Sequence, residues 1–253
     1  MKKFQKLTLA LLAVGALTLS SCLHIIEDVT FFNSGKGSYK MTIDMSEVKG
    51  MMEMMTGMAP ADSTGGDSGG GMEMPGAGGG EMGQMGKGLS EVATSLKNVQ
   101  GITNVVETND TTNFKFGYTF DFADVAALNR ALKVINKEKY QSKDEEIYKF
   151  TGKSFERLGA GDIGEEMKKA MSENDGGGEE GEEGGMDMSM IKNFFADMSY
   201  KQVYHFPDRE IKKQDNALGE VSDDKHTLTI LLKPFDEEQQ KKKVTVATAV
   251  KLK

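Results

Sequence analysis

The chain has 253 residues, of which 38% are hydrophobic and 28% charged, and its formal net charge is −8 at pH 7. This acidic balance disfavours nucleic acid as a partner, because nucleic-acid binding needs a basic surface. The single cysteine excludes an internal disulfide and a multi-thiolate metal centre.

The N-terminus has the three zones of a secretory signal. Lysines precede an uncharged apolar run over residues 7–19, which is too short for a permanent transmembrane helix. The run ends in Leu19-Ser20-Ser21-Cys22, which resembles the lipobox of bacterial lipoproteins. This resemblance implies removal of residues 1–21 and attachment of diacylglycerol to the Cys22 thiol. An ordinary secretory signal with a chance cysteine is the alternative interpretation.

Acyl chains on Cys22 would be the only membrane anchor that the sequence predicts. Each buried methylene contributes about 0.8 kcal/mol, so several acyl chains hold a protein on a membrane without a transmembrane helix. Leu23 follows the cysteine rather than aspartate, and by resemblance to Gram-negative sorting this implies the outer membrane. Residues 23–26 separate the cysteine from the acidic pair Glu27-Asp28, which favours the periplasmic face over the cell surface.

Two hairpins are predicted in the first half of the mature chain. Alternating side chains over 27–33 and 38–45 predict two strands around the turn at 33–37. A second pair of strands is predicted over 102–108 and 114–122. The last strand is expected to place five aromatic side chains on one face, at the centre of the core: Phe114, Phe116, Tyr118, Phe120 and Phe122.

An amphipathic helix is predicted over 125–135, with Asp121 or Asp124 capping its first turn. Further strands are predicted at five places: 147–151, 154–158, 200–206, 227–233 and 244–252. Further helices are predicted at three places: 163–172, 187–195 and a short stretch around Glu237 and Glu238. Hairpins separated by short helices predict an α+β fold, with an antiparallel sheet on which the helices pack.

Two glycine-rich segments interrupt this pattern, at about 57–88 and 173–186. Together they contain 19 of the 30 glycines, and both lie in stretches without aromatic residues. Because such segments have little apolar surface to bury, both are predicted to be disordered insertions. Residues 22–253 are therefore predicted to form one α+β domain that is interrupted by two loops.

Two stretches resemble known lipoproteins. The motif Val29-Thr30-Phe31-Phe32-Asn33, with Gly35-Lys36-Gly37-Ser38-Tyr39-Lys40-Met41 after it, resembles the opening hairpin of a Bacteroidota lipoprotein family and, more distantly, of LppM-type lipoprotein domains. The stretch Tyr204-His205-Phe206-Pro207, followed by Asn216 and residues 222–230, is similar to their closing region. The resemblance implies the fold and the envelope location, and it carries over no functional residue. The glycine-methionine insertion departs from the LppM-type pattern.

Methionine clusters suggest an alternative function. Thioethers are soft ligands that select Cu(I) or Ag(I), and clusters of this spacing resemble those of periplasmic copper-handling proteins. Methionine is also a flexible core filler, and glycine-methionine repeats occur as low-complexity sequence, so the main interpretation assigns no metal and no cofactor. The candidate ligands of the alternative are Met51, Met52, Met54, Met55, Met72, Met74, Met82 and Met85.

Two short motifs have both a functional and a structural interpretation. Residues 159–164 match GxGxxG, but the helix that follows leads into the acidic loop rather than a parallel strand, so a helix-capping turn at Asp162 is favoured over a dinucleotide site. Asp110-Thr111-Thr112 and Asp62-Ser63-Thr64 match the pattern of Bacteroidota O-glycosylation. Thr111 and Ser63 are therefore candidate glycosylation sites.

The sequence contains no GxSxG and no HExxH, and its three histidines are scattered. The main prediction is therefore a non-catalytic, membrane-anchored envelope lipoprotein whose sheet binds or scaffolds a protein or another envelope partner. Soft-metal binding by the methionine segment is the alternative. A hydrolase is a third hypothesis, and it would need a polar pocket around His205 or His226.

Overall fold

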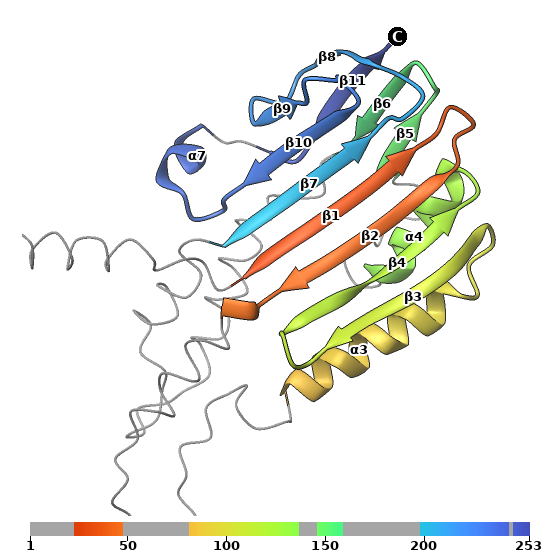
Figure 1. The fold of residues 1–253 in the computed structure, drawn as a ribbon, viewed down its shortest axis with the longest axis vertical. Coiled ribbons are helices and arrows are strands. Elements are labelled where there is room, and N and C mark those ends of the chain that lie inside the picture. Colours follow the sequence, from red (N-terminus) through yellow and green to blue (C-terminus); the bar gives the residue numbers. More distant parts are fainter. Residues whose placement is uncertain (1–22, 48–80, 137–145, 159–197, 243–244) are drawn as a thin grey trace, which may run out of the picture.

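The computed structural model describes residues 23–47, 81–136, 146–158, 198–242 and 245–253. Its larger sheet has seven strands in the order β3-β4-β2-β1-β7-β10-β9 (Figure 1). The bounds of these strands are β1 (His24–Phe31), β2 (Gly37–Asp44), β3 (Ile102–Asp110), β4 (Lys115–Phe122), β7 (Ser199–His205), β9 (Gly219–Val221) and β10 (Thr227–Leu232).

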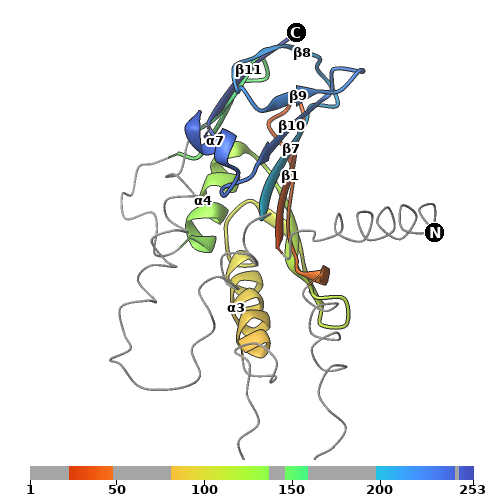
Figure 2. The same cartoon turned by 90° about the vertical axis from the view of Figure 1, so that its left-hand side faces the viewer.

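A second sheet of four strands and the helices lie on one side of the larger sheet. The strand order of the second sheet is β5-β6-β11-β8, and every pairing in it is antiparallel. Figure 2 shows α3, α4 and α7 on the same side of the seven-stranded sheet. The bounds are β5 (Tyr148–Phe150), β6 (Ser154–Arg157), β8 (Ile211–Gln214), β11 (Thr248–Leu252), α3 (Glu81–Leu96), α4 (Val125–Ile135) and α7 (Glu237–Lys241).

The α+β class is confirmed, and so are the hairpins, the helix at 125–135 and the short helix at Glu237, which fall on described residues. Both hairpins form, and Gly35 takes a φ of +81° in the first turn, a conformation that glycine adopts without strain. Asp124 is the N-cap of α4, since its Oδ1 accepts a hydrogen bond from the Ala127 backbone N at 2.7 Å. The α7 helix carries the expected pairs four residues apart, such as Glu237 with Lys241 at 3.6 Å.

The seven-stranded sheet is not wholly antiparallel, which corrects the predicted topology. β1 and β7 pair in parallel, with His24 opposite Ser199 and Thr30 opposite His205. Parallel neighbours need a crossover connection rather than a tight turn, and no local pattern in either strand specifies such a partner. The separate second sheet and the short strands β8 and β9 were also absent from the prediction.

The α3 helix corrects the predicted limits of the first glycine-rich loop. It begins at Glu81, so residues 81–88 are helical rather than disordered. Its described part turns Leu89, Val92 and Leu96 toward the core, at the spacing of one helix face. Glycine in a helix costs about 1 kcal/mol relative to alanine, and burial of this face offsets that cost. The rest of 57–88, the whole of 173–186 and the helices predicted at 163–172 and 187–195 lie outside the described residues.

Phe31 lies where the two sheets meet. Its ring is within 6.2 Å, centroid to centroid, of aromatic rings from both sheets and from the loop after β7: Phe122, Tyr148, Phe150, Phe155 and Phe206. Four of the five aromatic residues predicted along β4 are buried, whereas Phe114 precedes the strand with a φ of +54° and is only half-buried. Among the described residues, no helix is long and apolar enough to cross a membrane.

Candidate functional site

A carboxylate is buried between the two sheets. Glu27, on β1, is 2% exposed. Its Oε1 accepts a hydrogen bond from the Tyr148 hydroxyl at 2.6 Å, and its Oε2 accepts one from Gln202 Nε2 at 3.0 Å. The Tyr200 hydroxyl also donates to Oε2, and Arg157 Nη2 lies 3.3 Å from the same oxygen. These five residues are called the Glu27 cluster below.

Strand register brings the Glu27 cluster together. Inward positions on β1 and β7 alternate with outward ones, and Glu27 lies directly opposite Gln202. In the second sheet, Tyr148 on β5 pairs with Arg157 on β6. No local sequence pattern predicts this cluster as a unit. One sequence pattern indicates it in part: three side chains with polar groups stand at alternate positions of the buried strand β7. They are Tyr200, Gln202 and Tyr204.

The Glu27 cluster contains one ion pair, Glu27 with Arg157, so its net charge is zero. Burial alone would raise the pKa of Glu27, but the charge of Arg157 and the hydrogen bonds from Tyr148, Tyr200 and Gln202 outweigh it and hold the pKa below its ordinary value. Glu27 is therefore ionised at neutral pH. The Arg157 guanidinium also lies 5.9 Å from the centroid of the Tyr148 ring, within the range of a cation–π contact.

A cavity of about 430 Å³ borders the cluster at Arg157, between β6, β11 and the loop that follows β8. Asn216 holds its wall together, because its Nδ2 donates to the backbone oxygens of Thr245 and Ala247 at 2.9 and 2.8 Å. Arg157 Nε and Nη1 and Thr248 Oγ1 have no hydrogen-bond partner among the described residues, yet all three atoms are buried from solvent. Arg157 and Thr248 both belong to the residues that line this cavity. Because four side chains from three strands bind the Glu27 carboxylate, the Glu27 cluster fits a structural role at the junction of the sheets.

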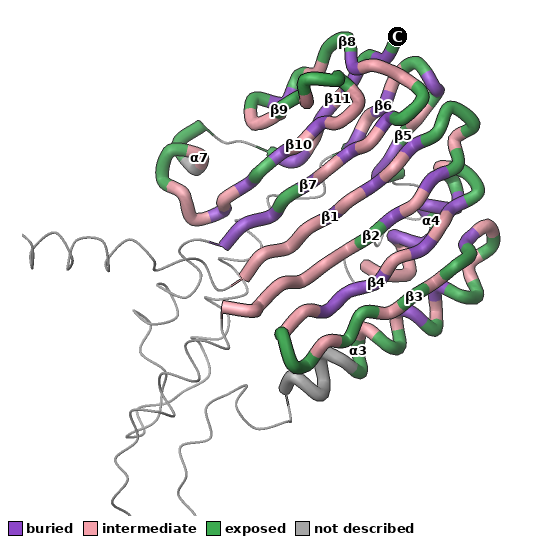
Figure 3. Tube along the Cα trace, viewed as in Figure 1, coloured by how far each residue is buried: buried purple, intermediate pink, exposed green. Residues whose placement is uncertain are grey.

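The other face of the seven-stranded sheet is covered by no described element (Figure 2). Half-buried stretches run along β1 and β2 in the middle of this face (Figure 3). Polar side chains facing outward opposite apolar ones facing inward are the usual pattern of a sheet with one solvated face. This outer face carries hydroxyl groups and charges of both signs: Thr30, Thr42, Thr119, Thr227, Thr229, Lys40, Lys115, Lys201, Asp28, Asp44, Asp121 and Glu220.

His205 lies on this outer face between a hydroxyl and a carboxylate. Its Nδ1 is 3.2 Å from Thr227 Oγ1, and its Nε2 is 3.3 Å from Asp28 Oδ2. A hydrolase would also need free N–H groups to stabilise an oxyanion. Because β7 is paired with β1 and β10 on both sides, its backbone N–H groups are used in the two ladders. His226 Nδ1 is 2.9 Å from the Phe206 backbone oxygen, and the cavity described above is lined by neither histidine.

Most residues predicted from motifs lie outside the described residues. This holds for Cys22, Ser63, residues 159–164 and six of the eight candidate methionine ligands. Met82 and Met85 belong to α3. The described residues contain no group of three or more His, Cys, Asp or Glu side chains arranged to hold a metal ion. Thr111 is exposed in the β3–β4 turn, where Asp110 Oδ1 accepts hydrogen bonds from the backbone N of Thr112 and of Asn113.

Comparison with known proteins gives one distant structural similarity. No protein-family model matches the chain, and no curated protein is similar to it. The folded domain of LppM from Mycobacterium tuberculosis, solved by NMR, aligns with 91% of this chain and 89% of its own, at 10% sequence identity and a TM-score of 0.38. No comparison bears on the Bacteroidota part of the resemblance noted in the sequence. Similarity at this level assigns neither a family nor a function.

Proposed function

We propose that the protein is a lipid-anchored, non-catalytic module of the bacterial envelope that binds a protein or another envelope partner through its outer face. The outer face is the observation that carries the proposal, because it is broad, polar and not covered by any described element. Interfaces between separately stable proteins are about as polar as the rest of the protein surface, so such a face suits a partner. The lipobox resemblance at Cys22 supports the anchor and a location at the outer membrane.

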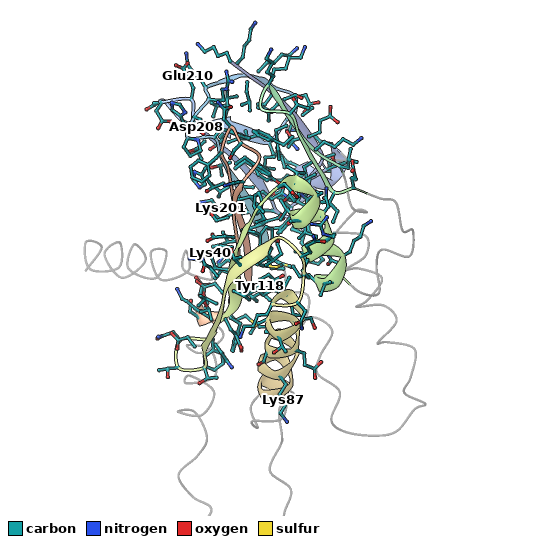
Figure 4. The ribbon with its side chains drawn as sticks, turned by 90° about the vertical axis from the view of Figure 1, so that its right-hand side faces the viewer. Lys40, Lys87, Tyr118, Lys201, Asp208 and Glu210 are labelled. Atoms are coloured by element: carbon teal, nitrogen blue, oxygen red, sulfur yellow. The ribbon has the colours of Figure 1, made fainter. Side chains whose placement is uncertain are left out.

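The outer face also has apolar points at which a partner could pack. Val106 on β3 is 60% exposed and Leu231 on β10 is 40% exposed. Both lie on the outer face, because Val106 is opposite Thr119 and Leu231 is opposite Lys201. Hydrogen-bonded strands hold these side chains at fixed spacings, which limits the ordering cost of binding. In the strand order, Lys40 on β2 and Lys201 on β7 lie between the strands of Val106 and Leu231. Figure 4 shows both lysines on the side of the sheet away from α4.

Site-specific photocrosslinking in the native cells tests the proposal. A photoreactive amino acid at Lys40 or at Lys201 is expected to give the same crosslinked product from both positions. The matched control is Glu91, which is exposed on α3 at the opposite side of the sheet and should not give that product. Equal crosslinking from Glu91, or none from both lysines, would contradict binding through the outer face.

The anchor is tested separately, since the chain has one cysteine. Metabolic labelling with palmitate should mark the wild-type protein and leave the Cys22→Ser variant unlabelled. Crosslinking from the outer face and labelling of Cys22 can fail independently, so the two parts of the proposal are distinguishable.

The methionine alternative makes a different prediction, and the structure sharpens its test. Because α3 begins at Glu81, a Gly/Ser replacement should end at residue 80, with Met82 and Met85 changed to leucine to keep the helix. On the proposed function, a Cu(I) titration with a chromophoric competitor should not distinguish this variant from the wild type. Stoichiometric Cu(I) binding by the wild type that the variant loses would favour the soft-metal function instead.

A further inference from the structure

The predicted anchor is joined to the large sheet without a spacer. Leu23 is already fixed, because its backbone oxygen accepts a hydrogen bond from the Ser199 backbone N at 3.2 Å, and β1 begins at His24. Consecutive Cα atoms are about 3.8 Å apart, so Cys22 is joined directly to a residue that the sheet holds in place. The lipid on Cys22 therefore has to lie close to the end of the sheet where β1 begins.

Strand register shows which other residues share this anchored end. Across the sheet, His24 is level with Asp44, Asp44 with Lys115, and Lys115 with Asp110. The β3–β4 turn at 111–114 is therefore level with the start of β1, and β3 lies three strands from β1. On the other side of β1, β7 also begins at this end and β10 finishes there. The anchored strand is thus an inner strand, and strand ends extend to both sides of it.

The outer face carries the apolar side chains Ile26, Val106, Val203 and Leu231 but has no excess of basic charge that would hold it flat on lipid. Surfaces that lie flat on membranes combine an apolar stripe with an excess of basic residues. Here the three lysines at 40, 115 and 201 are matched by acidic residues on the same strands and their neighbours, and Lys115 is paired with Asp44 at 3.0 Å. Lipid contact is therefore expected where the anchor imposes it, at the strand ends.

We infer that the domain stands end-on on the lipid surface, with the β3–β4 turn at the level of the headgroups and the strands directed away from the bilayer. This inference rests on the proposed lipid anchor at Cys22. The β1–β2 turn then lies at the far end, about 26 Å away for the eight residues of β1 at about 3.3 Å each. Asp208 stabilises the β1–β2 turn, because its Oδ2 accepts a hydrogen bond from the Asn33 backbone N at 2.9 Å. In this orientation the outer face remains accessible to partners.

Single tryptophans test this orientation, because the chain contains none. Thr112→Trp reports on the anchored end, Lys40→Trp on the middle of the outer face, and Ser34→Trp on the far end; all three positions are exposed. The mature protein, lipidated at Cys22, is placed in phosphatidylcholine vesicles that contain a lipid with a nitroxide on its headgroup. Most of the fluorescence of Thr112→Trp should be lost, and that of the other two variants should be retained.

Other results would overturn the inference. Equal loss from Lys40→Trp would mean that the domain lies on its outer face, and equal retention by all three would mean that no strand end meets the lipid. Circular dichroism of each variant checks that it is folded. A second preparation, in which residues 1–21 are absent and Cys22 is coupled to a maleimide lipid, carries the anchor whether or not cells lipidate this cysteine. It tests orientation even if palmitate labelling fails.

Discussion

Replacing Arg157 with methionine should lower the free energy of unfolding by about 3–5 kcal/mol, the usual cost of removing one partner of a buried ion pair. Arg157 is 6% exposed and Glu27 is 2% exposed, so the variant would leave the Glu27 carboxylate buried without its counter-charge. Methionine keeps much of the side-chain volume, which separates the loss of charge from the loss of packing. Denaturant-induced unfolding at neutral pH gives the change directly.

The double variant Glu27→Leu/Arg157→Met serves as the control. Removing both charges removes the unpaired carboxylate, so the double variant should be more stable than the sum of the two single changes predicts, by about 0.5–3 kcal/mol. Additive single effects would mean that the two side chains do not act as a pair. A loss below about 1 kcal/mol in Arg157→Met would contradict the buried cluster itself.

Glu27 also gives the expected pH dependence of this effect. Its pKa is lower in the folded protein than the ordinary value of 4.5 that applies to the unfolded chain. Ionised Glu27 therefore contributes stability that is fully present above the unfolded pKa and is lost as the pH falls through the folded pKa. The stability difference between the wild type and Glu27→Gln should thus be constant near neutral pH and shrink in acid. Unfolding curves measured at a series of pH values below neutrality check this.

Phe31→Ala should cost about 3–5 kcal/mol, the range for truncating a buried aromatic ring. The Phe31 ring is 1% exposed and contacts five aromatic rings at the junction of the two sheets. The adjacent Phe32 is the matched control, because it carries the same side chain but is 43% exposed. Phe32→Ala should change the free energy of unfolding by no more than about 0.5 kcal/mol. Similar losses in both variants would argue against the packing of the two sheets around Phe31.

Local periodicity was sufficient to predict the hairpins and the α4 helix. Alternation along β2 and β4 reflects one buried and one solvated face, and this pattern is written in the sequence of each strand. Asp124 could be foreseen as a cap because its side chain satisfies a backbone group only three residues away. Such features depend on interactions within a few residues and are therefore visible without the tertiary structure.

Features that depend on distant partners could not be predicted in this way. The parallel pairing of β1 with β7 joins residues 175 positions apart, such as His24 and Ser199. The glycines of 81–88 favour disorder locally, and only packing of Leu89, Val92 and Leu96 on the sheet makes α3 stable. Glu27 was interpreted as part of an acidic pair near the anchor, because the donors that surround it come from three other strands.

The same distinction between local motifs and distant contacts applies to the candidate functional residues. The resemblance to a leader and lipobox rests on local motifs, so Cys22 could be proposed from the sequence, whereas the outer face exists only once seven strands are assembled. Neither histidine could be assigned a role without its neighbours. Only the structure shows that His205 contacts Thr227 and Asp28 on an open face, rather than within a pocket.

The position of β1 has a mechanical consequence. With the proposed lipid anchor at Cys22, a pull directed away from the membrane would load the domain along the length of β1. Because β1 is hydrogen-bonded to β2 on one side and to β7 on the other, this load acts on both ladders in shear, and their bonds must break together. An edge strand pulled across its ladder would instead unzip one bond at a time. The pairing of β1 on both sides therefore gives the domain more resistance to extension along β1 than an edge strand would give.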